Sequence, residues 1–296
     1  MPSDVLTILN QPSRDAPAHA PGAAPWHFAD PRSAQVSALD LGATRGDGIF
    51  ETISVGDGFP QAFDHHLRRF ARSAAALELP APDLETWRGA ILATIAQLDS
   101  VPEAFVKTVL TRGIEGDGRP TGWAYGAVSG DFTDQRTHGI RVVMLDRGYR
   151  HDVEQTSPWL LAGAKTLSYA INRAAVREAA RRDADDVIFV SSDGIVLEGP
   201  TSTVLFRRGD TLVSPGTGLG ILDGTTQASV FRYAESLGLH TTFELASPES
   251  LRAADAVWLV SSVRLAAPVR ELDGQPLQVD TELTAGMNEH LRALRD

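Results

Sequence analysis

The 296-residue sequence contains no cysteine, and this absence excludes several kinds of site. Without thiols the chain has no disulfide framework, no iron–sulfur cluster and no thiolate zinc site. Its 8 histidines are scattered, and none stands four residues after another as paired metal ligands on a helix do. We therefore expect no metal site.

Positive charge is also scarce. The chain has 27 lysines and arginines against 38 aspartates and glutamates, a net charge of -11. A nucleic-acid surface needs a basic face that neutralises phosphates, so we expect no nucleic-acid partner. No apolar run reaches the roughly 18 residues that span a bilayer, and the N-terminus lacks the pattern of a signal peptide. The default expectation is a cytoplasmic enzyme without a membrane partner.

The length and composition are those of an ordinary globular protein, with 43% hydrophobic and 22% charged residues. Such a length accommodates two domains. Residues 11–25 are rich in proline and alanine and show no period, which predicts a poorly ordered N-terminal arm over 1–25. Periodicity breaks again after residue 146. We expect a small N-terminal α/β domain, a linker and a larger C-terminal domain, over 26–145, 146–156 and 157–296.

Hydrophobic patterns predict strands and helices in both halves. Mixed elements favour an α+β class built from two α/β domains, with a cleft between them as the expected site. The second half is expected to contain a three-stranded meander over 186–215, with turns at Asp193-Gly194 and Gly209-Asp210. The other expected strands are 48–55, 104–112, 141–146 and 256–263, and the expected helices include 63–79, 168–182 and 228–238.

Lysine is almost absent, since only Lys107 and Lys165 occur. Lys165 stands in the uncharged run "LLAGAKTLSYAIN", just before an expected helix. A lysine in apolar surroundings has a lowered pKa and becomes a nucleophile or base that forms Schiff bases. The alternative is a lysine that extends from a helix N-terminus to water.

Two further stretches suit the chemistry of such a lysine. Glu198 closes the apolar strand "GIVLEG", either pointing into a site or remaining a solvated edge charge. The stretch "LDGTTQASVF" places Thr225 and Thr226 where a helix starts. That position is either a cradle for phosphate or a plain N-cap. A lysine, a carboxylate and a phosphate cradle are together what pyridoxal phosphate requires.

The blocks "RGDGIFET", "HLRRF", "KTLSY", "EGPTSTVLF", "LDGTTQ" and "SSVRLAAPV" resemble, in this order, the fold-type IV pyridoxal-phosphate enzymes. That group contains branched-chain aminotransferases, D-amino acid aminotransferases and aminodeoxychorismate lyases. The resemblance runs from about Leu39 to Asp273. It implies pyridoxal 5'-phosphate as cofactor, bound in the cleft between the two domains, and a homodimer.

The resemblance also implies residue roles. Lys165 would bond to the cofactor and shuttle the proton, Glu198 would face the pyridine nitrogen, and Leu222 would pack on the ring. Arg69 would help to hold the phosphate. The alternative for Arg69 is a surface position like those of its neighbours Arg68 and Arg72. The chain departs from the family pattern at Thr203 and Gln227, and Tyr169 is shifted by one position. The phosphate would be held by Arg69, Thr225, Thr226 and Ser262.

Phe50 stands where many aminotransferases carry a tyrosine that contacts substrate, and this favours a lyase. Arg112 and Arg119 are candidates for binding the carboxylate of a small amino substrate. The preferred reaction is that of a 4-amino-4-deoxychorismate lyase, which gives 4-aminobenzoate and pyruvate for folate synthesis. The alternatives are a D-amino acid or branched-chain aminotransferase, a protein with both activities, or a homologue that binds the cofactor without turnover.

Overall fold

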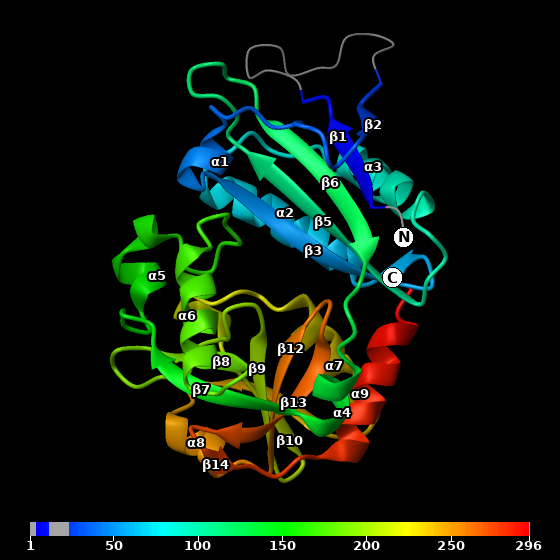
Figure 1. The fold of residues 1–296 in the computed structure, drawn as a ribbon. Helices are drawn as coiled ribbons and strands as arrows, with labels where there is room; N and C mark the ends of the chain where they lie inside the picture. Colours follow the sequence, from blue (N-terminus) through cyan, green and yellow to red (C-terminus); the bar gives the residue numbers. More distant parts are fainter. Residues whose placement is uncertain (1–3, 12–23, 296) are drawn as a thin grey trace. The chain divides into compact units, whose positions relative to one another are not determined.

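A computed structural model describes residues 4–11 and 24–295, which form two compact units (Figure 1). Unit 1 contains the described residues up to Gly130, together with Ala164–Tyr169 and the C-terminal residues from Leu294. Unit 2 contains Asp131–Gly163 and Ala170–Ala293. Each unit combines strands with helices, which confirms the predicted α+β class.

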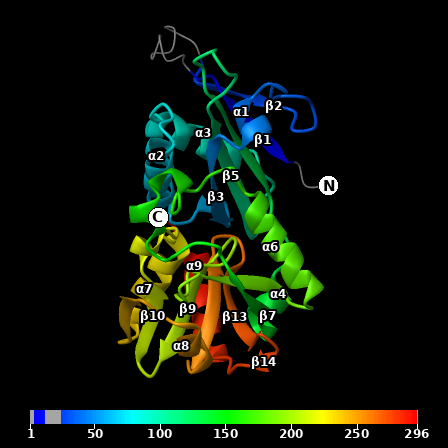
Figure 2. The same ribbon diagram turned by 90° about the vertical axis from the view of Figure 1, so that its left-hand side faces the viewer.

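Unit 1 is built on a six-stranded antiparallel sheet of order β2-β1-β6-β5-β3-β4. Two helices pack against the sheet and against each other (Figures 1 and 2). The expected strands at 48–55 and 104–112 and the helix at 63–79 are confirmed. The elements are β1 Val5–Leu9, β2 Trp26–Ala29, α1 Leu41–Arg45, β3 Gly48–Gly56, β4 Phe59–Pro60, α2 Phe63–Ala76, α3 Leu84–Ala96, β5 Glu103–Thr111 and β6 Thr121–Val128.

The predicted N-terminal arm over 1–25 is wrong for residues 4–11. These residues contain β1, whose side chains Val5, Leu6 and Leu9 are buried. Strand β1 pairs with both β2 and β6, so its apolar residues complete the sheet. Residues 12–23, with most of the proline-rich stretch, lie outside the described part of the chain.

Unit 2 is built on an eight-stranded mixed sheet of order β11-β10-β9-β12-β13-β7-β8, with β14 on β13. The pairs β10–β11, β13–β7 and β7–β8 are parallel. Its elements are α4 Thr133–His138, β7 Ile140–Asp146, α5 Val153–Thr156, α6 Ala170–Arg181, β8 Asp186–Val190, β9 Thr203–Arg208, β10 Thr211–Pro215, α7 Thr225–Ser236, β11 His240–Glu244, α8 Pro248–Arg252, β12 Ala256–Ser261, β13 Leu265–Leu272, β14 Gln275–Pro276 and α9 Thr281–Ala293, with short 3-10 turns at Pro158–Leu160 and Thr217–Leu219.

Both faces of this sheet are covered, as strand β12 illustrates. Val257 and Leu259 belong to an apolar cluster that also contains Leu251 of α8. The side chain of Trp258, between them, lies on the opposite face of the sheet. Its Nε1 donates to Thr284 Oγ1 of α9 at 2.7 Å. Alternation along the strand thus supplies two cores.

The predicted domain boundaries at 145, 146–156 and 157 are wrong. Unit 2 begins at Asp131, because β7 pairs in parallel with β8 and β13. The range 146–156 is not a linker, because its backbone is hydrogen-bonded to the end of β8 and to the residues after it. Arg147 N donates to Val190 O at 2.8 Å, and Ser192 N donates to Tyr149 O at 2.8 Å.

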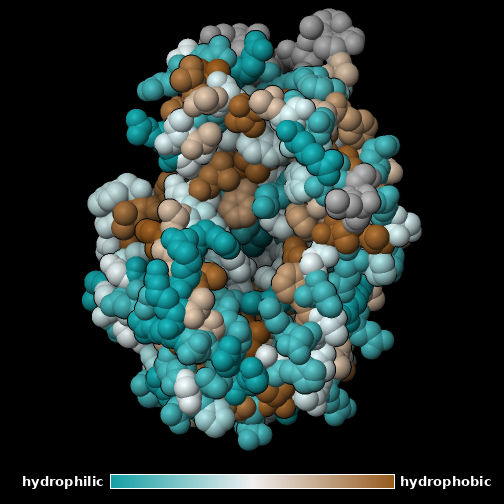
Figure 3. All heavy atoms as spheres, viewed as in Figure 1, coloured by the Kyte–Doolittle hydropathy of each residue, from teal (hydrophilic) through white to brown (hydrophobic). Residues whose placement is uncertain are grey.

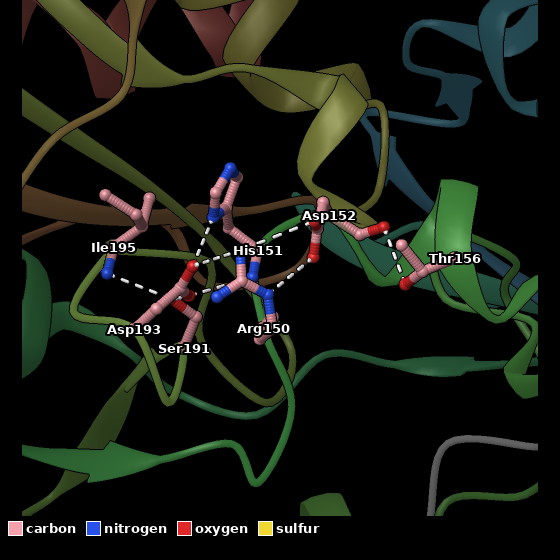
Figure 4. Close-up of polar contacts among 7 residues, drawn as sticks. All are labelled: Arg150, His151, Asp152, Thr156, Ser191, Asp193 and Ile195. Carbon is pink, nitrogen blue, oxygen red and sulfur yellow. Dashed lines mark hydrogen bonds and ion pairs between the residues drawn. The ribbon is translucent and has the colours of Figure 1, made fainter.

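A cluster of side chains fastens the same range to the Asp193-Gly194 turn (Figure 4). The Asp193 carboxylate accepts from the backbone N and ring Nδ1 of His151 at 3.0 and 2.6 Å. Ser191 Oγ donates to it at 2.7 Å, and Arg150 Nη2 lies 3.4 Å away. These hydrogen bonds, that of Ser191 first, hold the pKa of Asp193 well below its usual range. An ionised Asp193 therefore anchors residues 150–151 to the turn.

The predicted meander over 186–215 is also wrong. After the turn, residues 195–198 run back along β8, with Leu197 N donating to Phe189 O at 2.8 Å. The chain then leaves at Gly199-Pro200, and β9 lies away from β8 in the sheet. Only β9 and β10 form the expected hairpin, at the predicted Gly209-Asp210 turn.

Within residues 4–11 and 24–295, no helix combines the length and apolarity that crossing a membrane requires. The face drawn in Figure 3 is largely hydrophilic, with apolar side chains in smaller groups. Large apolar side chains exposed in unit 2 include Trp159, Leu160 and Ile171.

Candidate active site

Lys165 is held at the edge of β3 in unit 1. Thr166 forms an antiparallel bridge with Ile49, and Phe50 N donates to Lys165 O at 3.0 Å. On its other side, Lys165 N donates to Ser73 Oγ of α2 at 3.1 Å. The segment therefore acts as a short additional strand, which fixes the lysine backbone on both sides.

The Lys165 amine lies against an aromatic ring, with Nζ 4.4 Å from the centroid of Phe50. Tyr169 packs edge-on against the same ring, with centroids 5.4 Å apart. Lys165 is half-buried and lies five residues before α6. The structure thus brings the predicted catalytic lysine beside the predicted substrate-facing phenylalanine.

Arg69 lies inside unit 1 and not on its surface. Its Nε and Nη2 donate to the two carboxylate oxygens of Glu51 at 2.7 and 2.8 Å. His66 Nδ1 lies 2.7 Å from Glu51 Oε2. The exposed fractions of Glu51, His66 and Arg69 are 1%, 1% and 7%, whereas Arg68 and Arg72 are exposed. Arg69 alone of the three arginines is therefore available for an interior role.

The position of this cluster follows from two periodicities. Glu51 alternates with Ile49 and Ile53, which are fully buried, so it shares their face of β3. His66 and Arg69 stand three residues apart and therefore share one face of α2. Glu51 and His66 were not among the predicted site residues, although a carboxylate at a buried strand position was a signal for Glu51.

The charges of the cluster follow from its burial. Burial alone would raise the pKa of Glu51, but the charge and hydrogen bonds of Arg69, aided by His66, hold that pKa well below its usual range. Burial lowers the pKa of His66, which Glu51 only partly offsets. At neutral pH Glu51 is ionised and His66 is neutral, so the His66 ring donates its Nδ1 proton to the carboxylate.

In unit 2 the structure brings Glu198 and Leu222 together. Leu222 N donates to Glu198 Oε2 at 3.1 Å. Phe189 N donates to the backbone O of Glu198 at 2.8 Å, which fixes the residue to β8. The carboxylate is half-buried and close enough to Tyr149 to contribute to raising its pKa, after the larger effect of burial.

The start of α7 has the features of an anion site. The helix begins at Thr225, with Gly224 as its N-cap, and Thr225 and Thr226 are buried. A Cβ on Gly224 would lie 2.5 Å from Thr203 Oγ1, so the close approach requires glycine. Thr203 opens β9, which pairs with β12, and Ser262 follows the end of β12. The hydroxyls of Thr203, Thr225 and Thr226 thus lie at or beside a helix N-terminus, whose N–H groups and positive dipole suit a phosphate.

The two candidate arginines for substrate differ. Arg112 Nε donates to Asp47 Oδ2 at 2.6 Å, and its terminal nitrogens donate to Leu77 O and Glu78 O at 2.7 and 3.2 Å. It therefore ties the end of α2 to the turn before β3. Arg119 is exposed in the loop between β5 and β6. Binding of a substrate carboxylate by either residue stays a prediction.

Comparisons with known proteins agree on one family. The family described as amino-transferase class IV matches residues 48–272. A bifunctional aminodeoxychorismate lyase / D-amino acid transaminase of Mycobacterium tuberculosis is 42% identical over 248 residues, which are 80% of this chain and 86% of that protein.

Solved structures of the same kind are similar along nearly the whole chain. The fold IV-transaminase CpuTA1 from Curtobacterium pusillum has a TM-score of 0.94 and 55% identity, over 98% of this chain and 97% of that one. A hypothetical aminotransferase from Mycobacterium tuberculosis, in a PLP-bound form, has a TM-score of 0.87 and 36% identity, over 97% and 98%.

Proposed function

This chain belongs to the amino-transferase class IV family of pyridoxal-phosphate-dependent enzymes, and from that membership we propose that it is a 4-amino-4-deoxychorismate lyase that also transfers amino groups from D-amino acids. The observation that carries the proposal is the apolar surface beside the reactive amine, where Phe50 lies 4.4 Å from Lys165 Nζ. The relative with both activities supports the pairing of the two reactions.

Each predicted site residue has a role in this proposal. Bound pyridoxal phosphate supplies an aldehyde for an amine and a ring that withdraws electrons from the substrate carbon. Lys165 would hold that aldehyde through its amine, and the same amine would serve as the base that takes the proton from the amine-bearing carbon of the substrate. Glu198 would keep a proton on the pyridine nitrogen, and Leu222 would pack on the ring. The phosphate would be held by Arg69, Thr225, Thr226 and Ser262.

The buried Arg69 and the α7 N-terminus fit a phosphate because both offer donors to an anion. Arg69 belongs to unit 1 and the α7 N-terminus to unit 2.

Expulsion of pyruvate requires no second substrate, whereas transamination requires a 2-oxo acid in a second half-reaction. Phe50 offers no hydroxyl to such an acid, and this favours the lyase. Transamination is the second candidate, which the similarity to a fold IV-transaminase at 55% identity favours. A branched-chain substrate is the remaining variant of it. A homologue without turnover is disfavoured, since Lys165 and Glu198 are both present.

We expect one preparation to release pyruvate and 4-aminobenzoate from aminodeoxychorismate faster than it transfers an amino group from D-alanine to 2-oxoglutarate. The measurement is kcat/KM for both reactions, since their ratio reports relative stabilisation of the two transition states. Transamination faster by about tenfold or more, about 1.4 kcal/mol in barrier, would reverse the order of the two activities. The absence of both would leave the cofactor-binding homologue.

We expect Arg69→Ala to weaken cofactor binding far more than Arg68→Ala or Arg72→Ala. A charge-assisted contact contributes about 1.5–3 kcal/mol, roughly 10- to 150-fold in affinity, whereas an exposed arginine contributes little. The measurement is titration of each apo-variant with pyridoxal phosphate, with thermal melting as the control for folding. Equal affinity in the three variants would remove Arg69 from the phosphate site.

The family resemblance also leads us to propose a homodimer. Trp159, Leu160 and Ile171 are exposed by 74%, 54% and 62%, and a second copy is the proposed cover for this apolar surface. The substrate is a small amino compound with a carboxylate, for which Arg119 is the less engaged of the two candidate arginines.

A further inference from the structure

Glu51 is the centre of the buried cluster in unit 1, and the proposed function gives it no role. Its two oxygens accept three hydrogen bonds, two from Arg69 and one from His66. We propose that Glu51 is a positioning residue for the cofactor phosphate, because it fixes the orientation of the Arg69 guanidinium. The inference rests on the proposed binding of phosphate by Arg69.

The geometry of the pair carries this inference. The guanidinium is planar, and its Nε and Nη2 on one edge meet both oxygens of one carboxylate. Two contacts on one edge fix the plane of the group and the direction of its opposite edge. His66 in turn holds the carboxylate through Oε2. An arginine ordered in advance loses less conformational freedom when it binds an anion, which strengthens binding.

The charges of the cluster make the test decisive. Glu51 is ionised, so its negative charge offsets that of Arg69 and opposes the approach of a phosphate dianion. If charge alone governed binding, Glu51→Gln would strengthen the binding of phosphate. If orientation governs, the same substitution weakens it, because an amide presents one acceptor oxygen and an NH2 group that repels the guanidinium. The two explanations therefore predict opposite signs.

The experiment compares two ligands in each apo-variant of the full chain. Pyridoxal phosphate and pyridoxal both bond to Lys165, and the visible absorbance of that bond gives both affinities. We expect Glu51→Gln to lower the affinity for pyridoxal phosphate by about tenfold or more and that for pyridoxal by less than about twofold. Glu51→Asp, which keeps the charge on a shorter side chain, should recover part of the loss.

Asp64→Asn is the matched control. Asp64 lies on the same helix α2 and pairs with Arg88 at 2.6 Å, but its side chain is 63% exposed. The ratio of the affinity for pyridoxal phosphate to the affinity for pyridoxal should equal, in Asp64→Asn, that of the wild-type protein. The ratio is taken within one variant, so a partly unfolded preparation lowers both affinities and leaves the ratio unchanged.

An unchanged or increased ratio in Glu51→Gln, or an equal decrease in Asp64→Asn, would overturn the positioning role. Arg69→Ala in the same assay separates this failure from that of the proposed function. If Arg69→Ala leaves the ratio at the wild-type value, the assignment of phosphate to Arg69 is wrong and the inference falls with it. If Arg69→Ala lowers the ratio and Glu51→Gln does not, only the inference about Glu51 is wrong.

Discussion

A Lys165→Ala variant is expected to lose the visible absorbance of the covalently bound cofactor together with its turnover. The amine lies against Phe50 at 4.4 Å, and hydrogen bonds fix the lysine backbone on both sides. Because the proposed roles of the lysine are to bond to the cofactor and to move the substrate proton, we expect a loss of roughly 10³-fold or more in kcat. Steady-state kinetics and the absorbance spectrum provide the measurement.

The chain offers a matched control for this experiment, because Lys107 is its only other lysine. Lys107 is exposed on β5, and Lys107→Ala should keep both the absorbance and the turnover. Borohydride reduction followed by peptide mass mapping locates the modified residue. A reducible adduct on Lys107 or on the N-terminus in the Lys165→Ala variant would show that the assignment is wrong.

A Glu198→Gln variant is expected to retain the cofactor and lose about 100-fold in kcat, equivalent to about 2.7 kcal/mol in the barrier. Gln keeps the shape of Glu and still accepts the hydrogen bond from Leu222 N, which measures 3.1 Å in the structure. What it loses is the negative charge that, in the proposed function, would keep a proton on the pyridine nitrogen, so the ring would withdraw electrons less well.

The measurement is kcat together with the cofactor content of the purified variant. Loss of cofactor along with activity would indicate that Glu198 acts mainly by holding the Leu222 loop. Activity within about threefold of wild type, below 1 kcal/mol, would return Glu198 to the solvated edge charge that its strand position also allows.

Local patterns predicted the elements that carry most of the candidate site. Strand β3 and helix α2 were correct because their apolar residues repeat with periods that arise within the element itself. Glycine and threonine before an apolar run indicated a helix start, and α7 begins at Thr225, three residues before the expected helix over 228–238. Two site residues were also recognisable from local sequence. Lys165 is one of only two lysines, and Glu198 closes an apolar stretch.

Sheet order was not accessible in this way, since it depends on partners distant in the sequence. Strand β13 was not among the expected strands. It contains Pro268, a residue that argues against a strand with neighbours on both sides, yet β13 pairs with β12 and β7. A register shift between Val269 and Glu271 accompanies the proline in this strand. The meander failed likewise, because adjacency in sequence does not place β8 beside β9.

The Glu51 cluster shows a third kind of limit. A carboxylate inside a strand has one meaning if it faces water and another if it meets an arginine. Only the packing of α2 on β3 decides between them, and it placed Glu51 between His66 and Arg69. The chain departs from the family pattern at Thr203 and Gln227. The Thr203 side chain occupies the space beside Gly224.

The edge of β3 has a consequence for the order in which the protein is made. Gly48–Phe50 leaves the ribosome well before Ala164–Tyr169, the segment that covers this edge. Until then the nascent chain presents an uncovered strand edge, which is a template for pairing with other chains. A gene fragment ending at Gly130 would make that exposure permanent, since it contains the strand and lacks its cover. The reactive lysine thus also completes the sheet, and the two units are not separable at a single cut in the gene.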